Sequence, residues 1–209
     1  MIKAVLFDLD GVLVDACDWH YNALNQALVH FGEKEISRED HETKFNGLPT
    51  EEKLIKLGIE SFRRSEIKTL KQEITTGYIL ECCKPDQSKI YLLKKLHADG
   101  IKVGVVTNCS EDTARLMLNK LGLATEFEIL VHNKSTQYPK PNPDPYFYAM
   151  ARLGVKPTEC LIVEDSPKGL ESARLSGGNI YGAANSKDVT AELMLPCIEA
   201  LNNALGKYS

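Results

Sequence analysis

Two carboxylates stand near the start of the chain, where a short apolar run ends. Residues 4–7 are apolar, Asp8 follows at once, and Asp10 and Gly11 come after one further residue. Carboxylates are costly inside a buried strand, so this position indicates a strand that ends on a site. One carboxylate can attack phosphorus as a nucleophile, and a second can transfer protons to the leaving oxygen and from water.

Further polar side chains follow three later apolar runs. They are Thr107 and Asn108 after 101–106, Lys140 in the loop after 127–131, and Glu164 and Asp165 after 161–163. In a parallel sheet ligands bind beyond the carboxyl ends of the strands, so these groups are expected to meet. Carboxylate oxygens suit Mg²⁺, which neutralises charge between an anionic nucleophile and a phosphate. A hydroxyl, backbone N–H groups and a lysine can bind the phosphoryl oxygens.

The elements that position these groups alternate along the second half of the chain. Helical spacing covers 89–96, 111–121, 143–153 and 168–175, and apolar strand-like runs cover 101–106, 127–131, 161–163 and 179–181. Strands and helices in alternation predict an α/β fold with a parallel, Rossmann-like sheet and helices on both faces. Continuous apolar strands agree with burial on both sides.

Residues 16–82 follow a different pattern, since helical spacing predominates and no convincing strand occurs. We therefore predict a helical insert of 16–82 within a core domain made of 1–15 and 83–209.

Composition limits the classes of function. The 209 residues are 43% hydrophobic and 26% charged, with a net charge of −4. No basic stripe suggests nucleic acid, and no apolar stretch is long enough to span a membrane. The six cysteines form no regular framework, which favours free thiols and a cytoplasmic protein. We expect a monomer or weak oligomer.

Four ordered motifs resemble those of the haloacid dehalogenase superfamily. They are Phe7-Asp8-Leu9-Asp10-Gly11-Val12-Leu13-Val14-Asp15, Val105-Val106-Thr107-Asn108, Lys140-Pro141-Asn142-Pro143-Asp144-Pro145-Tyr146 and Val163-Glu164-Asp165-Ser166-Pro167-Lys168-Gly169. One Asp-x-Asp alone would be weak evidence, whereas four motifs in order are strong, and they span the whole chain. The helical insert resembles the small cap of the phosphoglycolate phosphatase and β-phosphoglucomutase branch. By analogy, this cap would close over the core and select the substrate.

The resemblance implies a role for each motif residue. Asp8 would be the nucleophile and Asp10 the general acid/base. Thr107 and Asn108 would hold the phosphoryl oxygens, and Lys140 would neutralise charge between nucleophile and phosphate.

The resemblance also implies a Mg²⁺ site. Asp8 and Asp165 would ligate the ion through their side chains, and Asp10 would ligate it through its backbone carbonyl. Glu164 would ligate it directly or through water. The cofactor would thus be Mg²⁺, and the substrate a small phosphorylated metabolite.

Cap residues bear on the choice between phosphatase and mutase. His20 matches a cap-hinge histidine that would hold Asp10 back until substrate arrives, although a helix histidine bonded to a neighbour is an equal alternative. Asn46, Gly47 and Thr50 lie in the cap loop that enters the site, where mutases carry a lysine and an arginine for a second phosphate. Without those cations, the distal phosphate of a bisphosphate intermediate has no bidentate binding partner. Hydrolysis is therefore favoured, with a phosphosugar mutase as the alternative if Lys53, Arg63 or Arg64 supplies the charge.

Other classes fit less well. Dehalogenases lack the second acid and the metal, whereas Asp10 and Asp165 are both present. Phosphonate hydrolysis needs a cap lysine, and we expect Lys44 and Lys53 at the surface of a helix. A signalling receiver domain would not need the insert, and a silent binding module would be expected to have lost Asp8 or Asp10. The sequence predicts a Mg²⁺-dependent phosphatase, with its substrate open.

Overall fold

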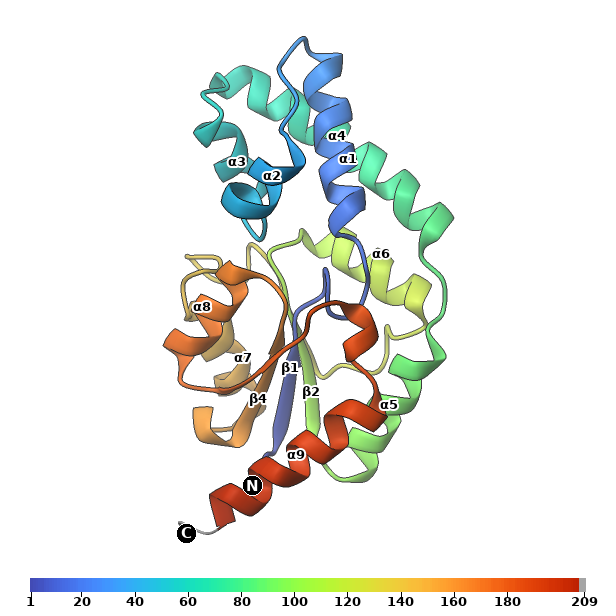
Figure 1. Ribbon diagram of the computed structural model, residues 1–209, viewed down its shortest axis with the longest axis vertical. Coiled ribbons are helices and arrows are strands. Elements are labelled where there is room, and N and C mark those ends of the chain that lie inside the picture. Colours follow the sequence, from blue (N-terminus) through green and yellow to red (C-terminus); the bar gives the residue numbers. More distant parts are fainter. Residues whose placement is uncertain (207–209) are drawn as a thin grey trace.

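The computed structural model describes residues 1–206 and contains one five-stranded parallel sheet (Figure 1). The strands lie in the order β3-β2-β1-β4-β5, so β1 is central. Their bounds are β1 (Ala4–Phe7), β2 (Lys102–Val106), β3 (Ile129–Val131), β4 (Cys160–Glu164) and β5 (Asn179–Gly182). All pairs are parallel, and Phe7 lies level with Val105 of β2 and Val163 of β4. The carboxyl ends of the strands therefore face the same edge, as the α/β prediction required.

Helices cover both faces of this sheet. They are α5 (Gln87–Ala98), α6 (Glu111–Leu121), α7 (Asp144–Leu153), α8 (Pro167–Ser176) and α9 (Ala191–Gly206). Alternate residues of β1 point to opposite faces: Val5 and Phe7 pack in one apolar cluster with α5, α6 and α9, whereas Ala4 and Leu6 pack in a second with α7 and α8. This double burial explains why the strands are continuously apolar. Helix α9 was not among the predicted elements.

Local signals set the helix boundaries near the site. The side chains of Ser110 and Ser166 accept hydrogen bonds from the backbone N–H groups of Thr113 and Gly169, and so cap α6 and α8. Helix α6 ends at Gly122, which adopts the left-handed conformation that favours glycine. Each cap places a helix start just beyond a strand end, beside the predicted site.

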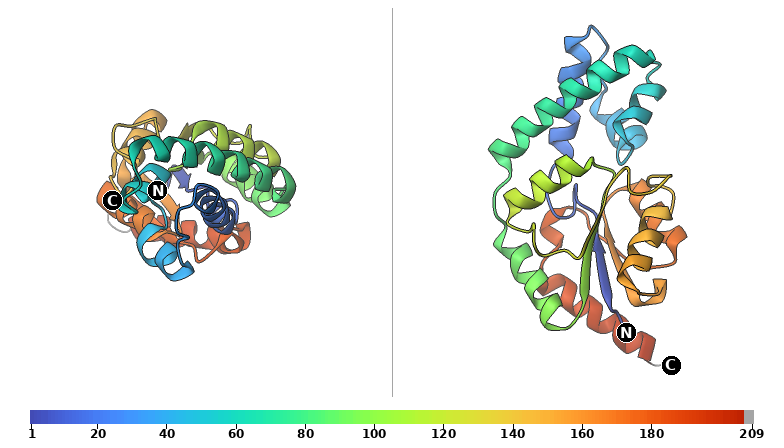
Figure 2. Two further views of the ribbon diagram at one scale, coloured as in Figure 1. Left: turned by 90° about the horizontal axis from the view of Figure 1, so that it is seen from above. Right: turned by 180° about the vertical axis from the view of Figure 1, so that it is seen from behind.

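The segment between β1 and α5 is wholly helical in its regular structure and stands beyond the carboxyl edge of the sheet (Figures 1 and 2). It comprises α1 (Cys17–His30), α2 (Arg38–Asp40), a π-helical turn (His41–Phe45), α3 (Thr50–Lys56) and α4 (Ser61–Cys82). It has an apolar cluster of its own, which includes Leu24, Leu54 and Ile67. This cluster supports the proposed division into a cap, 16–82, and a core, 1–15 plus 83–209, of which 207–209 lie outside the described residues.

Side-chain hydrogen bonds join the cap to the core. The Gln72 amide on α4 donates to the Thr113 hydroxyl on α6 over 2.7 Å, and the Asn108 amide donates to the Gly47 carbonyl over 2.9 Å. The cap loop therefore rests on the carboxyl edge of the sheet. Through residues 1–206, no helix has the length and apolar content needed to cross a bilayer.

Candidate active site

The chain turns sharply after β1 and so brings Asp8 and Asp10 to the sheet edge. Gly11 has φ +90°, and its N–H donates to the Val14 carbonyl over 2.7 Å. A Cβ at Gly11 would lie 2.0 Å from Asp165 Oδ2. Glycine is therefore required here both by the backbone conformation and by the close approach of the two motifs.

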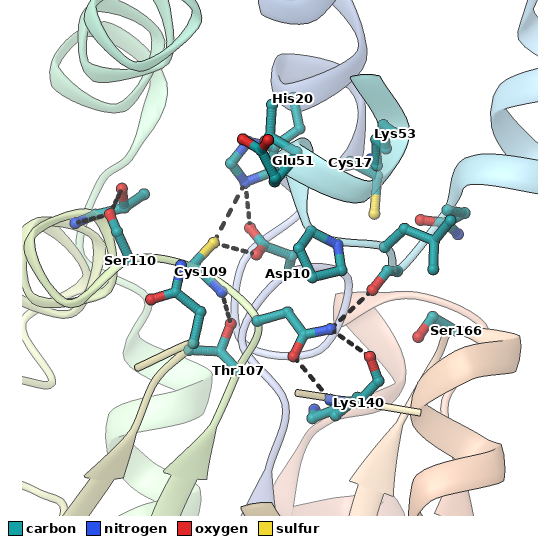
Figure 3. A pocket seen from close by; sticks show the side chains of 18 of the residues that line it. Asp10, Cys17, His20, Glu51, Lys53, Thr107, Cys109, Ser110, Lys140 and Ser166 are labelled. Carbon is teal, nitrogen blue, oxygen red and sulfur yellow. Dashed lines mark hydrogen bonds and ion pairs between the residues drawn. The ribbon is translucent and has the colours of Figure 1, made fainter. Parts of the chain in front are cut away.

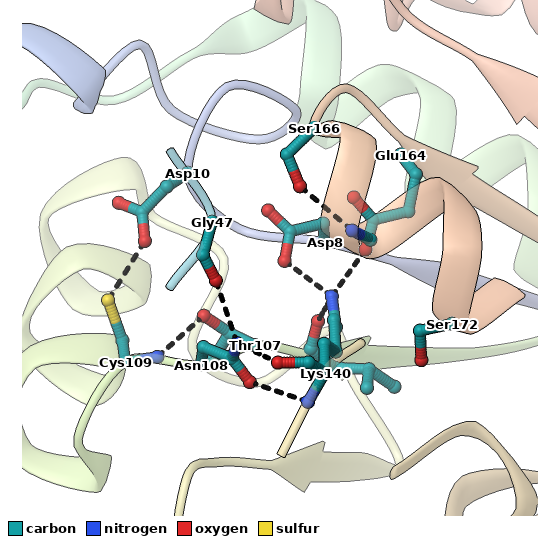
Figure 4. A network of polar contacts seen from close by, with 12 residues as sticks. Asp8, Asp10, Gly47, Thr107, Asn108, Cys109, Lys140, Glu164, Ser166 and Ser172 are labelled. Carbon is teal, nitrogen blue, oxygen red and sulfur yellow. Dashed lines mark hydrogen bonds and ion pairs between the residues drawn. The ribbon is translucent and has the colours of Figure 1, made fainter. Parts of the chain in front are cut away.

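Lys140 connects three strand ends beneath the site (Figure 4). Its ammonium lies 2.7 Å from Asp8 Oδ1, 2.5 Å from Glu164 Oε1 and 2.6 Å from the Val106 carbonyl oxygen. The Tyr146 hydroxyl donates to the same Glu164 oxygen over 2.6 Å. Burial alone would lower the pKa of Lys140, but the charges of Asp8 and Glu164 outweigh it and raise the pKa to about 12. Lys140 is thus a permanent cation beside Asp8.

The carboxylates at the carboxyl edge of the sheet, which form the floor of the site, fit a divalent metal ion. One carboxylate oxygen from each of Asp8, Glu164 and Asp165 lies within 4.8 Å of the others. Two buried oxygens, Glu164 Oε2 and Asp165 Oδ1, have no hydrogen-bond partner. Burial raises the pKa of Asp8 well above its usual range; Lys140 opposes this shift and the neighbouring carboxylates add to it. Burial and the charge of Glu164 raise the pKa of Asp165 to about 7. A hard cation would relieve this repulsion and occupy the orphaned oxygens.

The three acids are not equally available to such an ion. Glu164 is fully buried, and its Oε1 already accepts from Lys140 and Tyr146. A Cβ at Gly169 would lie 1.9 Å from Glu164 Oε2, so this carboxylate is wedged against α8. Asp8 and Asp165 are the freer donors. The backbone carbonyl of Asp10 stays a predicted ligand.

Asp10 points to the cap side and takes part in a separate network (Figure 3). His20 Nε2 lies 2.9 Å from Asp10 Oδ1, and the Cys109 thiol donates to Asp10 Oδ2 over 2.8 Å. Lys71 Nζ lies 2.9 Å from His20 Nδ1. Because an ammonium can only donate, Nδ1 must accept, and the proton on Nε2 is then directed at Asp10.

The protonation states follow from this chain of contacts. Burial and the charge of Lys71 lower the pKa of His20. Burial would raise the pKa of Asp10, but the His20 contact and the Cys109 hydrogen bond outweigh it and bring the pKa to about 2. Asp10 is therefore an ionised carboxylate held by His20, which is the contact that the resemblance implied.

Thr107 and Asn108 follow β2 and adopt different arrangements. Thr107 is buried, and its hydroxyl accepts from the backbone N–H of Cys109 over 3.0 Å, which leaves its own proton for a ligand. The Asn108 amide donates to the carbonyls of Gly47 and Lys140, and its oxygen accepts from the Lys140 N–H over 3.1 Å. Asn108 thus ties the cap loop to the Lys140 loop, and its amide is already engaged.

These groups enclose one cavity of about 250 Å³ between cap and core. Of the predicted site residues, those that line it are Asp8, Asp10, His20, Asn46, Gly47, Thr50, Thr107, Asn108 and Lys140. Glu164 and Asp165 lie beside Asp8 at its floor.

Several lining residues were not among the predicted site residues, although Lys53 was named as an alternative source of charge. Lys53, expected at the surface of a helix, is instead only 8% exposed and lines the cavity together with Lys71 and Cys109. Lys44, by contrast, is exposed and pairs with Asp40. Helical spacing does not show on which face of its helix a lysine meets the core, so the sequence offered Lys53 only as an alternative source of charge and gave no signal for Lys71. Cys109 directly follows the second motif, and its position there was the available signal.

Comparisons with known proteins agree with this geometry. The model of the haloacid dehalogenase-like hydrolase family matches residues 5–183. A Clostridium perfringens relative named as a pyrophosphatase, PpaX, is 31% identical over 87% of this chain and 84% of its own. A phosphoglycolate phosphatase of Aquifex aeolicus is 28% identical over 84% and 82%. The crystal structure of a β-phosphoglucomutase from Clostridium difficile superposes with a TM-score of 0.84 at 23% identity and covers 98% of this chain and 99% of that one, a likeness of fold. This chain therefore belongs to the haloacid dehalogenase-like hydrolase family.

Proposed function

We propose that this protein is a Mg²⁺-dependent phosphatase that hydrolyses a small phosphorylated metabolite through an aspartyl-phosphate on Asp8. The observation that carries the proposal is the buried carboxylate of Asp8, which contacts the Lys140 ammonium, lies beside the Asp165 carboxylate and lines the cavity. Relatives named as phosphatases support the same reaction class. Asp8 and Asp165 would hold Mg²⁺, which when bound supplies charge neutralisation at the phosphoryl group.

The residues of the chain divide the reaction into two steps. An oxygen of Asp8 forms a bond to phosphorus as the ester bond breaks, and the leaving oxygen takes a proton from Asp10. Water then attacks the aspartyl-phosphate, gives a proton back to Asp10, and releases phosphate and free Asp8. Thr107 and Lys140 stabilise the phosphoryl oxygens in both steps.

Proton transfer requires Asp10 to change partners. With a pKa of about 2, Asp10 carries no proton while His20 and Cys109 hold it. An anionic substrate raises that pKa, and release from His20 lets the carboxyl turn toward the leaving oxygen. The cap, which supplies His20, thereby couples substrate binding to the acid/base group.

The cap loop favours water over a second sugar as the acceptor. Asn46 and Thr50 line the cavity where the resemblance places the mutase cations, and no arginine among residues 1–206 lines it. Of the three alternative cations, Arg63 pairs with Glu66 and Arg64 with Glu51. Lys53 does line the cavity, but it offers a single ammonium and not a guanidinium. A bidentate grip on a second phosphate is therefore lacking.

The test is Asp8→Asn, which keeps shape and removes the nucleophile. Phosphate release from p-nitrophenyl phosphate in the presence of Mg²⁺ is expected to fall at least about a thousandfold, with an unchanged melting temperature. Asp15→Asn is the matched control, because it makes the same substitution at an exposed aspartate nearby in the sequence. Substantial activity in Asp8→Asn would refute the mechanism. Conversion of β-glucose 1-phosphate to glucose 6-phosphate faster than phosphate release would establish the mutase instead.

A further inference from the structure

Lys53 is a buried cation without a partner in the wall of the cavity. It lies on α3, is 8% exposed and lines the cavity. Across residues 1–206, no carboxylate lies within 4.0 Å of its ammonium, and no hydrogen bond to the ammonium is formed. The side chain is buried, but its ammonium is not among the fully buried unpaired atoms, so the charge meets the cavity, where an anionic ligand would compensate it.

The other cationic groups of the cavity already have partners. Lys68 pairs with Glu51 at 2.8 Å, Lys71 contacts His20, and Lys140 contacts Asp8 and Glu164. Lys53 alone among the lysines that line the cavity, within the part of the chain that the structure describes, is left for a ligand.

The electrostatic surroundings of Lys53 also suit an anion. Burial and the charge of Lys71 lower its pKa to about 8, and the charge of Asp10 offsets this only in part. Below that pH the ammonium keeps its proton in a low-dielectric wall beside a second cation. An anion bound there would be attracted by both charges with little screening.

Lys53 lies apart from Lys140, the cation beside the nucleophile. Figure 3 shows Lys53 on the cap side of the cavity and Lys140 on the sheet side. Asp10 and the thiol of Cys109 lie at an intermediate height in that view, to the left of both lysines. A substrate whose phosphoryl group rests on the floor would therefore direct its other end to Lys53.

We propose that Lys53, with Lys71 beside it, forms a subsite for a second anionic group, a carboxylate or a phosphate, at the end of the substrate away from the transferred phosphoryl group. This inference rests on the proposed phosphatase function and narrows its substrate class to small metabolites with two anionic groups. The preference arises from a charge-assisted hydrogen bond, which is stronger than a neutral one.

Matched substrate pairs test the subsite. 3-Phosphoglycerate and glycerol 3-phosphate differ by a carboxylate against a hydroxymethyl group, and fructose 1,6-bisphosphate and fructose 1-phosphate differ by a second phosphate. Phosphate release in Mg²⁺ yields kcat/KM for each compound, and the ratio within a pair measures the preference for the second anion. The pair with the larger ratio identifies the anion as a carboxylate or a phosphate. Wild-type protein is expected to favour the anionic member of at least one pair by about tenfold or more.

Lys53→Met removes the charge and keeps the length of the side chain. We expect it to lower the ratio at least about tenfold, and Lys53→Arg to retain it. Lys56→Met is the control, because Lys56 lies on the same helix and is exposed; its ratio should equal that of wild type. Because methionine removes a charge from a buried side chain, the melting temperature of Lys53→Met should not fall. If Lys53→Met fails to fold, Lys53→Gln replaces it in the same assay.

The outcomes separate the two proposals. Phosphate release with a ratio that Lys53→Met leaves unchanged would overturn the subsite alone, as would a wild-type preference for the neutral member of both pairs. No phosphate release from any of the compounds, or from p-nitrophenyl phosphate, would overturn the proposed function and the subsite with it.

Discussion

Replacement of Lys140 by methionine would expose how strongly the floor of the site depends on one cation. The ammonium makes three contacts, with Asp8, Glu164 and the Val106 carbonyl, and its side chain is 4% exposed. Lys140→Met leaves two buried carboxylates without their cation, and only the Tyr146 hydroxyl remains on Glu164. Removal of one partner from a buried ion pair costs about 3–5 kcal/mol. At about 2–4 °C per kcal/mol for a chain of this size, the melting temperature should fall by roughly 6–20 °C.

The loss should depend on pH with a defined sign. Burial raises the pKa of Asp8, and Lys140 is the group that lowers it, so the variant raises that pKa further. A carboxyl whose folded pKa lies above its unfolded value contributes stability below the unfolded pKa and loses it as pH rises through the folded pKa. The deficit of Lys140→Met should therefore be larger near pH 8 than near pH 5.

Urea denaturation and thermal melts in EDTA, near both pH values, measure this deficit. Lys134→Met, at an exposed lysine in the same loop, should stay within about 0.5 kcal/mol of wild type. Glu164→Gln added to Lys140→Met should recover part of the loss, because it removes one unpaired charge. A Lys140→Met protein as stable as the control, or a deficit equal at both pH values, would refute the reasoning.

Two further changes probe the floor and its packing. Without Mg²⁺, the stability that Asp165 contributes is complete below pH ~4 and lost as pH rises through about 7. Thermal melts across this range should show a smaller fall in melting temperature for Asp165→Asn than for wild type. Mg²⁺ should stabilise wild type, and not this variant, at high pH. Gly169→Ala would place a Cβ 1.9 Å from the buried Glu164 carboxylate and should cost about 1–3 kcal/mol or more in urea denaturation. Gly77→Ala, in an open part of α4, should gain up to about 1 kcal/mol; equal effects of the two alanines would contradict the packing argument.

The sequence by itself determined which residues meet at the sheet edge. Asp8, Thr107 and Asp165 each follow an apolar run, and parallel strands place all their carboxyl ends on one side. The continuous apolar run of β1 and the capping serines are equally local signals, and the predicted elements lie within a few residues of the observed ones. The central strand and the floor of the cavity were therefore predictable.

Only the tertiary structure decided which cap residues line the cavity opposite the sheet. Lys53 and Lys71 lie on cap helices whose spacing does not distinguish an exposed lysine from one that the cap buries against the core. The thiol contact between Cys109 and Asp10, and the wedge of Glu164 between Tyr146 and α8, arise from pairs far apart in the chain. Packing within the core sets these two sets of contacts, whereas docking of the cap, which has its own apolar cluster, places Lys53 and Lys71 in the wall of the cavity. The charge that the cap presents to a substrate is thus a property of the assembled fold, not of any one segment.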